Sequence, residues 1–150
     1  MLALGALAIL GRGVTAQTPA PAPRALTYAL AVQAMDAAEA EARRNNWNVT
    51  IVVTDAEGVP VMLRRLDNAS PRSYDIAMRK AATVVASKLP TSVYGQRLEA
   101  GQVAEVPNGI TFAGGVPVIR GGAVIGAVGT SGVRAEEDER VSQAGADAIR

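Results

Sequence analysis

Two adjacent glycines, Gly121 and Gly122, separate two apolar stretches in the C-terminal half of the chain. The stretches are residues 116–120 and 123–130. Gly-Gly is a two-residue turn that supplies the positive φ values of a tight hairpin. A hairpin joins antiparallel strands, whereas parallel strands need a crossover of a dozen or more residues. This region is therefore expected to form an antiparallel hairpin, and the glycine-rich stretch that begins at Ile110 is expected to contain one further strand before it.

A second hairpin is predicted earlier in the chain. Residues 49–54 are a β-branched run, and the turn sequence Asp-Ala-Glu-Gly at 55–58 separates it from residues 59–66. Runs of this kind bounded by turn residues are typical of paired strands.

Helices are expected between and around the hairpins. They are predicted at residues 26–45, 73–89, 91–100 and 136–150. In the first, apolar residues recur every four positions, as on one face of a helix. Ser70 or Ser73 is expected to cap the second helix, and Thr91 or Ser92 the third.

The order of elements is thus α-ββ-α-α-β-ββ-α. Hairpins in place of βαβ units predict a single α+β domain in which helices pack against an antiparallel sheet. The chain has 150 residues, of which 49% are hydrophobic, and this is enough for one domain with a sizeable core.

The N-terminus differs in composition from the rest. Residues 2–10 are mostly apolar, and small residues follow up to Ala16, which predicts a signal peptide at 1–16 and export to the periplasm or the medium. The apolar run is too short to anchor the chain in a membrane. Residues 17–25 are rich in Pro and Ala and are expected to be a linker, so that the domain spans 26–150.

The residue types that the chain lacks limit the kinds of reaction and metal site that it can support. The chain has no Cys and no His, which excludes disulfides, thiolate chemistry and a Ser-His-Asp triad. A metal site would use carboxylates and carbonyls and would favour hard cations. The net charge is +1 without a basic stripe, which argues against nucleic acid as a partner.

Several charged residues are candidates for a site. Glu136 and Glu139, three residues apart on the last helix, could hold a metal ion, although acidic residues also compensate the dipole at a helix start. Lys80 could pair with Asp67 or with an acidic residue of the last helix, or act as a buried amine. Arg65 and its neighbour Arg64 could bind a ligand carboxylate or form ion pairs at a strand end.

Two further features are polar or backbone elements. Gly114 and Gly115 precede a strand and would let backbone or a ligand approach closely. No phosphate-loop pattern accompanies the glycines. Thr91 and Ser92 would expose hydroxyls at a helix start, where they could meet a polar group of a ligand.

Six short motifs occur in a fixed order along the chain. They are Asp55 with Gly58, RLDNA at 65–69, RKAAT at 79–83, GGVPV at 114–118, GAVGTSG at 126–132, and Asp138 with Glu139. In this order they resemble the GlcG/HbpS haem-binding family, which also occurs as the C-terminal domain of PduO-type proteins. The resemblance covers about residues 26–150, which is nearly all of the chain that would remain after removal of the predicted signal peptide.

The resemblance implies a five-stranded antiparallel sheet flanked by helices, a homo-oligomer, and haem or a related tetrapyrrole as ligand. Haem iron is usually held by His, Cys, Met or Tyr. Because the chain lacks His and Cys, haem iron here would need an oxygen ligand, Met78, Lys80, a Tyr, or no strong axial ligand. The resemblance to haem-binding members makes Thr91 the first candidate. Lys80 or Arg65 would then pair with the haem propionates.

Three functions remain open from the sequence. The first is an exported, oligomeric haem-binding protein. The second is an enzyme acting on a small organic acid or aromatic compound, with Lys80, Asp67 or Asp138 as acid–base groups, which would require a pKa shifted toward neutrality. The third is an interaction subunit whose pocket is only the seam of an oligomer.

Overall fold

The computed structural model describes residues 25–149. The predicted signal peptide and all of the predicted linker except Ala25 lie outside the described residues. The elements are α1 (Tyr28–Arg44), β1 (Thr50–Asp55), β2 (Pro60–Arg65), α2 (Arg72–Ser87), α3 (Thr91–Glu99), β3 (Gly115–Arg120), β4 (Ala123–Ser131) and α4 (Ala135–Asp147). Each predicted helix and both hairpins are confirmed, with bounds shifted by at most three residues.

The sheet has four antiparallel strands in the order β2-β1-β4-β3. The prediction of five strands is wrong. The stretch from residue 110 to 114 is a loop: the carbonyl oxygen of Gly114 accepts from Thr130 N–H of β4, but two backbone N–H groups of the stretch donate to side chains of helices. Ile110 N–H donates to Thr83 Oγ1 of α2, and Gly114 N–H donates to a carboxylate oxygen of Glu139 in α4.

Local chemistry fixes the turns. Gly121 and Gly122 have φ values of +57° and +76°, which two-residue hairpin turns require and which glycine adopts without strain. In the first hairpin, Asp55 Oδ1 accepts hydrogen bonds from the N–H groups of Glu57 and Val59. Prolines occupy the N-cap positions of both α2 and α3, so the predicted side-chain cap of α3 is wrong, whereas at the start of α2 Ser70 Oγ accepts from Arg72 N–H at 3.3 Å.

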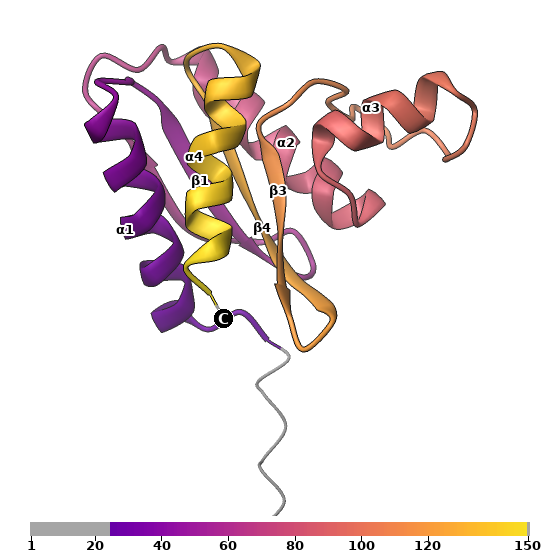
Figure 1. Ribbon diagram of the computed structural model, residues 1–150, viewed down its shortest axis with the longest axis horizontal. Coiled ribbons are helices and arrows are strands. Elements are labelled where there is room, and N and C mark those ends of the chain that lie inside the picture. The colour runs from indigo at the N-terminus through magenta and orange to yellow at the C-terminus, as the bar shows by residue number, and fades with distance from the viewer. Residues whose placement is uncertain (1–24, 150) are drawn as a thin grey trace, which may run out of the picture.

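Helices α1 and α4 lie side by side over one face of the sheet (Figure 1). The main core lies between them and the sheet and is built from alanines on α1, Val141 of α4, and inward-facing strand residues such as Ile51, Val53 and Val128. Four of the five buried residues of α1 are alanines, and their small side chains let this helix approach the sheet closely.

Helix α2 covers the opposite face of the sheet (Figure 1), where its backbone approaches β3 and β4. Gly115 and Gly129 are cross-strand partners on this face. A Cβ at Gly129 would lie 2.3 Å from the carbonyl oxygen of Ala77, and one at Gly115 would lie 2.8 Å from that of Lys80. These two glycines therefore allow the backbone of α2 to rest directly on the sheet.

Helix α3 and the loop that follows it project to one side of this sandwich (Figure 1). The returning loop packs closely on α3, since a Cβ at Gly95 would lie 1.9 Å from the carbonyl oxygen of Thr111. Tyr94 of α3 is buried but is not a member of the main core cluster, and its hydroxyl accepts a hydrogen bond from the N–H of Val106. Among residues 25–149, no helix is both long and apolar enough to cross a membrane.

Candidate functional site

A cleft of about 910 Å³ lies between α3, the loop at residues 111–113 and the first turns of α4. We call it the α3/α4 cleft. Its apolar surface includes Leu98, Phe112 and Ala113, and its polar groups include Ser92, Glu136 and Glu139. Its volume is in the range of small-molecule sites, which typically measure about 300–1,000 Å³.

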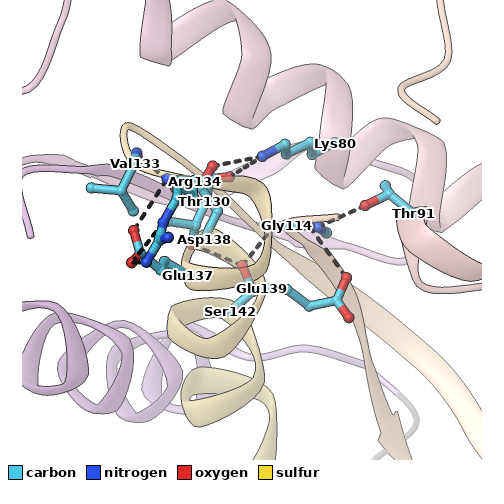
Figure 2. Close-up of polar contacts among 11 residues, drawn as sticks. Lys80, Thr91, Gly114, Thr130, Val133, Arg134, Glu137, Asp138, Glu139 and Ser142 are labelled. Atoms are coloured by element: carbon cyan, nitrogen blue, oxygen red, sulfur yellow. Dashed lines mark hydrogen bonds and ion pairs between the residues drawn. The ribbon is translucent and has the colours of Figure 1, made fainter. Parts of the chain in front are cut away.

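Glu139 joins the three elements that form this cleft. Its Oε1 accepts a hydrogen bond from the Ser92 hydroxyl of α3 at 3.1 Å. Its Oε2 accepts from the N–H of Gly114, just before β3, at 3.3 Å (Figure 2). The carboxylate thus lies at the junction of the cleft, beside the hydroxyl of Ser92.

The start of α4 is held by a buried ion pair. Lys80 Nζ of α2 lies 2.9 Å from Asp138 Oδ2 and also donates to the carbonyl oxygen of Thr130 at 2.9 Å (Figure 2). The second carboxylate oxygen of Asp138 accepts from Val133 N–H at 3.1 Å. The predicted pairing of Lys80 with an acidic residue of the last helix is therefore confirmed.

Both partners are almost fully buried, with side-chain exposures of 0% for Lys80 and 3% for Asp138. Burial lowers the pKa of Lys80 and raises the pKa of Asp138, and in each case the opposite charge of the partner acts against that shift. Lys80 Nζ also lies 5.0 Å from the ring centroid of Phe112. The ammonium is therefore fully engaged beneath the wall of the cleft.

A second buried group fixes the entry to β3. Ser142 Oγ donates to the carbonyl oxygen of Gly114 at 2.8 Å and lies 2.7 Å from Thr130 Oγ1 (Figure 2). Gly114 has φ +127°, and a Cβ there would lie 2.2 Å from Lys80 Nζ. Gly114 therefore makes room for the buried ammonium.

Thr91 is fully buried, and its Oγ1 accepts from Gly115 N–H at 3.0 Å. Thr91 does not line the α3/α4 cleft, whereas the residue that follows it, Ser92, does. The structure thus brings Lys80, Thr91, Gly114 and Gly115 together. Arg65 lies apart from them, exposed on β2 at the other edge of the sheet. Iron ligation by Thr91 stays a prediction.

Glu136 and Glu139 both line the α3/α4 cleft, as neighbouring residues on one helical face. In the described part of the chain, no group of three or more acidic residues is close enough to hold a metal ion. The metal role of this pair therefore stays a prediction.

The three acid–base candidates do not form one site. Lys80 and Asp138 are paired with each other inside the protein. Asp67 instead lines a separate cleft beside Trp47 and Asn68.

Arg64, a neighbour of Arg65, forms ion pairs with Asp36 and Glu39 of α1, each at 2.7 Å.

A second, smaller cleft of about 460 Å³ lies between α2 and the loop at residues 109–112. We call it the α2/loop cleft. Arg72, Asp75, Ile76 and Arg79 of α2 line one side of it. The sequence did not predict this cleft, and it did not indicate Phe112 as a lining residue of the larger one, whereas Ser92 was already a candidate for contact with a ligand. Phe112 is the only phenylalanine of the chain, and this was the signal in the sequence that could have indicated it as a site residue.

These features define a single-domain α+β protein with a ligand-sized cleft where α3, α4 and the entry to β3 meet. The sequence pattern of the HbpS-like family, described as haem degrading protein HbpS-like, matches residues 26–147. The chain therefore belongs to this family, which confirms the resemblance.

Relatives and solved structures agree with this assignment. Protein GlcG of Escherichia coli K12 is 36% identical over 108 residues, which are 71% of this chain and 81% of GlcG. The crystal structure of a double mutant of Streptomyces reticuli HbpS is similar with a TM-score of 0.77 and 33% identity, covering 97% of this chain and 99% of that one. The crystal structure of a PduOC:heme complex is similar with a TM-score of 0.77 and 29% identity, covering 84% and 96%.

Proposed function

We propose that this protein binds haem and that the α3/α4 cleft is the binding site. The observation that carries the proposal is the combination, in one cleft of about 910 Å³, of apolar walls with hard oxygen donors. The similarity to a structure solved as a heme complex supports the same ligand.

The available donors are consistent with ferric haem. The chain offers neither His nor Cys, and no Met or Tyr is among the residues that line the cleft. The oxygen donors on its walls include the hydroxyl of Ser92 and the carboxylates of Glu99, Glu136 and Glu139. Carboxylate oxygens suit hard metal ions. Glu139 is the first candidate for the iron ligand, because its carboxylate is held in place by Ser92 and Gly114.

The test is a titration of the purified protein with hemin, followed by Soret absorbance and by quenching of Trp47, the only tryptophan. Saturable binding with a shifted Soret band is expected. Glu139→Gln, which keeps the shape but not the charge, should change the Soret position and weaken binding about tenfold, the effect of losing one charge-assisted contact.

Glu57→Gln is the matched control, because Glu57 is exposed in the β1–β2 turn and lines neither the α3/α4 nor the α2/loop cleft. Unchanged spectra for hemin mixed with the wild-type protein would refute haem binding. A normal Soret shift in Glu139→Gln would instead remove Glu139 as the ligand and leave Ser92 or Thr91, which Ser92→Ala and Thr91→Ala would separate.

We further propose that the protein is exported and assembles into a homo-oligomer. The apolar run at residues 2–10 supports export. Large apolar side chains exposed on the domain, among them Tyr74, Phe112 and Ile119, support assembly. Expression in a bacterial host should give periplasmic protein with Gln17 as its N-terminal residue, measured by mass spectrometry, and light scattering should give a mass above that of one chain. Cytoplasmic protein that retains residues 1–16, or a monomeric mass, would refute the respective proposal.

A further inference from the structure

The α3/α4 cleft has the wrong charge for a ligand that carries carboxylates. Glu99, Glu136 and Glu139 line it against a single cation, Arg140. Arg140 is already engaged, because its Nη2 lies 2.7 Å from a carboxylate oxygen of Glu41 and its guanidinium lies 5.1 Å from the Trp47 ring centroid. Haem propionates would meet mostly like charge in this cleft, which is unfavourable.

The two cations that the sequence offered for the propionates are not available to the cleft either. Lys80 is buried and committed to Asp138 and Thr130. Arg65 lies on β2, at the edge of the sheet opposite β3. Carboxylates of a ligand in this region therefore need other partners.

The α2/loop cleft supplies them. Arg72 and Arg79 line it, with Asp75 as the only anion among its lining residues. They are seven residues apart on α2, which is about two helical turns and places both on the same face. Ile76, Ile110 and Phe112 form the apolar part of the wall.

Both guanidinium groups have free donors. Arg72 takes part in none of the ion pairs found among residues 25–149. Arg79 donates from Nε to the carbonyl oxygen of Asn108 at 3.0 Å, which fixes the side chain, and its Nη1 is 3.7 Å from Asp75 Oδ2. A guanidinium has five N–H donors, so the terminal nitrogens of both arginines remain able to bind carboxylates in a bidentate manner.

The two clefts meet at Thr111 and Phe112, which line both of them. Phe112 is 47% exposed even though it is a large apolar residue. A planar apolar ligand that covers this ring would have carboxylates of Glu139 and Glu136 on one side and the guanidinium groups of Arg72 and Arg79 on the other.

We propose that Arg72 and Arg79 hold the carboxylates of the ligand, while its apolar body covers Phe112 and extends into the α3/α4 cleft. This rests on the proposed haem function and assigns the orientation of the ligand at that same site. It also predicts a preference for tetrapyrroles with free carboxylates over their esters.

The experiment compares hemin with hemin dimethyl ester, whose propionates carry no charge, both titrated in the same detergent-containing buffer. In the variant Arg72→Gln/Arg79→Gln, the Kd for hemin should rise at least about tenfold, because two charge-assisted contacts are lost. The Kd for the dimethyl ester should equal that of the wild-type protein. Phe112→Ala should weaken both ligands to the same degree.

The charge-matched control is Arg97→Gln/Arg120→Gln, which removes two arginines that line neither cleft and should leave both Kd values unchanged. Equal weakening of hemin and ester in Arg72→Gln/Arg79→Gln would overturn the proposal, because the arginines would then act through the fold. Unchanged hemin binding in that variant would overturn it as well. Failure of the wild-type protein to bind either ligand would refute the haem function itself, and the wild-type titration identifies that outcome separately.

Discussion

The two faces of the sheet are stabilised in different ways. On the face under α1 and α4, the interior is a continuous apolar cluster that includes Ile51, Val53, Val128 and Val141. On the face under α2, the buried apolar cluster is small, with Ala81, Val84 and Ala127 as its fully buried members. There the backbone of α2 rests on Gly115 and Gly129, and the ion pair of Lys80 with Asp138 links α2 to α4.

Because of this difference, effects on the stability of the domain can be tested separately from effects on ligand binding. The apolar face depends on filled volume, and a gap there costs transfer and cavity energy. The α2 face depends on close backbone contact and on paired charges, and it carries the arginines that line the α2/loop cleft. Mutations on the two faces should therefore differ in their effects on ligand binding even where they cost similar stability.

The largest effect is expected from Lys80→Met. It leaves the carboxylate of Asp138 buried without its partner, and removal of one member of a buried pair typically costs about 3–5 kcal/mol. Chemical denaturation should show this loss in the free energy of unfolding. Because Asp138 also fixes the start of α4, hemin affinity should fall with it.

The double variant Lys80→Met/Asp138→Leu tests the reason for that loss. Replacing both charges with apolar side chains removes the unpaired buried carboxylate and should recover much of the stability. If the double variant is as unstable as Lys80→Met, the cost arises from packing, and the contrast between the two faces fails at this point.

The next-largest effects are expected at Gly129 and Val128, two neighbouring residues of β4 that face opposite sides of the sheet. Gly129→Ala places a methyl group 2.3 Å from the carbonyl oxygen of Ala77, and this overpacking should cost about 3 kcal/mol. Val128→Ala opens a gap in the apolar cluster and should cost about 2 kcal/mol.

Hemin titration of the folded variants then distinguishes the faces. Gly129→Ala displaces α2, which carries Arg72 and Arg79, and should weaken binding. Val128→Ala should leave the Kd unchanged. Equal Kd values for the two variants would contradict the view that the site depends on the α2 face. Ala123→Val, at an exposed position of the same strand, controls for a change of size in β4.

The arrangement of elements was predictable because its signals are local. Gly121 with Gly122, and the Asp-Ala-Glu-Gly turn, specify hairpins through backbone geometry that few other residues provide. The error at residues 110–114 has a physical cause. Apolar residues beside glycines are typical of a strand, but here Thr83 and Glu139, which are distant in sequence, accept the backbone hydrogen bonds.

The site was predictable only in part. Lys80 stands out as a charged residue on a predicted helix, and its pairing with an acidic residue of the last helix was one of the roles that the sequence indicated. The three-residue spacing of Glu136 and Glu139 predicted that both lie on one helical face. Arg72 and Arg79 did not stand out, because exposed arginines on a helix are common. Only the fold of the loop over α2 makes a cleft between them and Phe112, and no spacing in the sequence encodes that loop.

The smallest effect concerns an ion pair at the rim of the apolar face. Arg64 Nη1 donates to Glu39 Oε2 at 2.7 Å, and this hydrogen bond is the main reason why the pKa of Glu39 is lowered from 4.5. A carboxyl whose pKa is lower in the folded state stabilises the protein above the unfolded pKa. That contribution is lost as the pH falls from about 4.5 through the folded value. Glu39→Gln should therefore cost less than about 1 kcal/mol at pH 7 and lose this part of the acid dependence, measured by urea denaturation from pH 7 to 3.

Salt distinguishes this rim pair from the buried one. In about 1 M salt the Debye length falls to about 3 Å, so the stability difference between wild type and Glu39→Gln should shrink. The difference between wild type and Lys80→Met should persist, because Lys80 and Asp138 are shielded from solvent ions. Equal salt sensitivity of the two differences would mean that water reaches the Lys80–Asp138 pair, and the charge on the α2 face would then be no more buried than the charge at the rim.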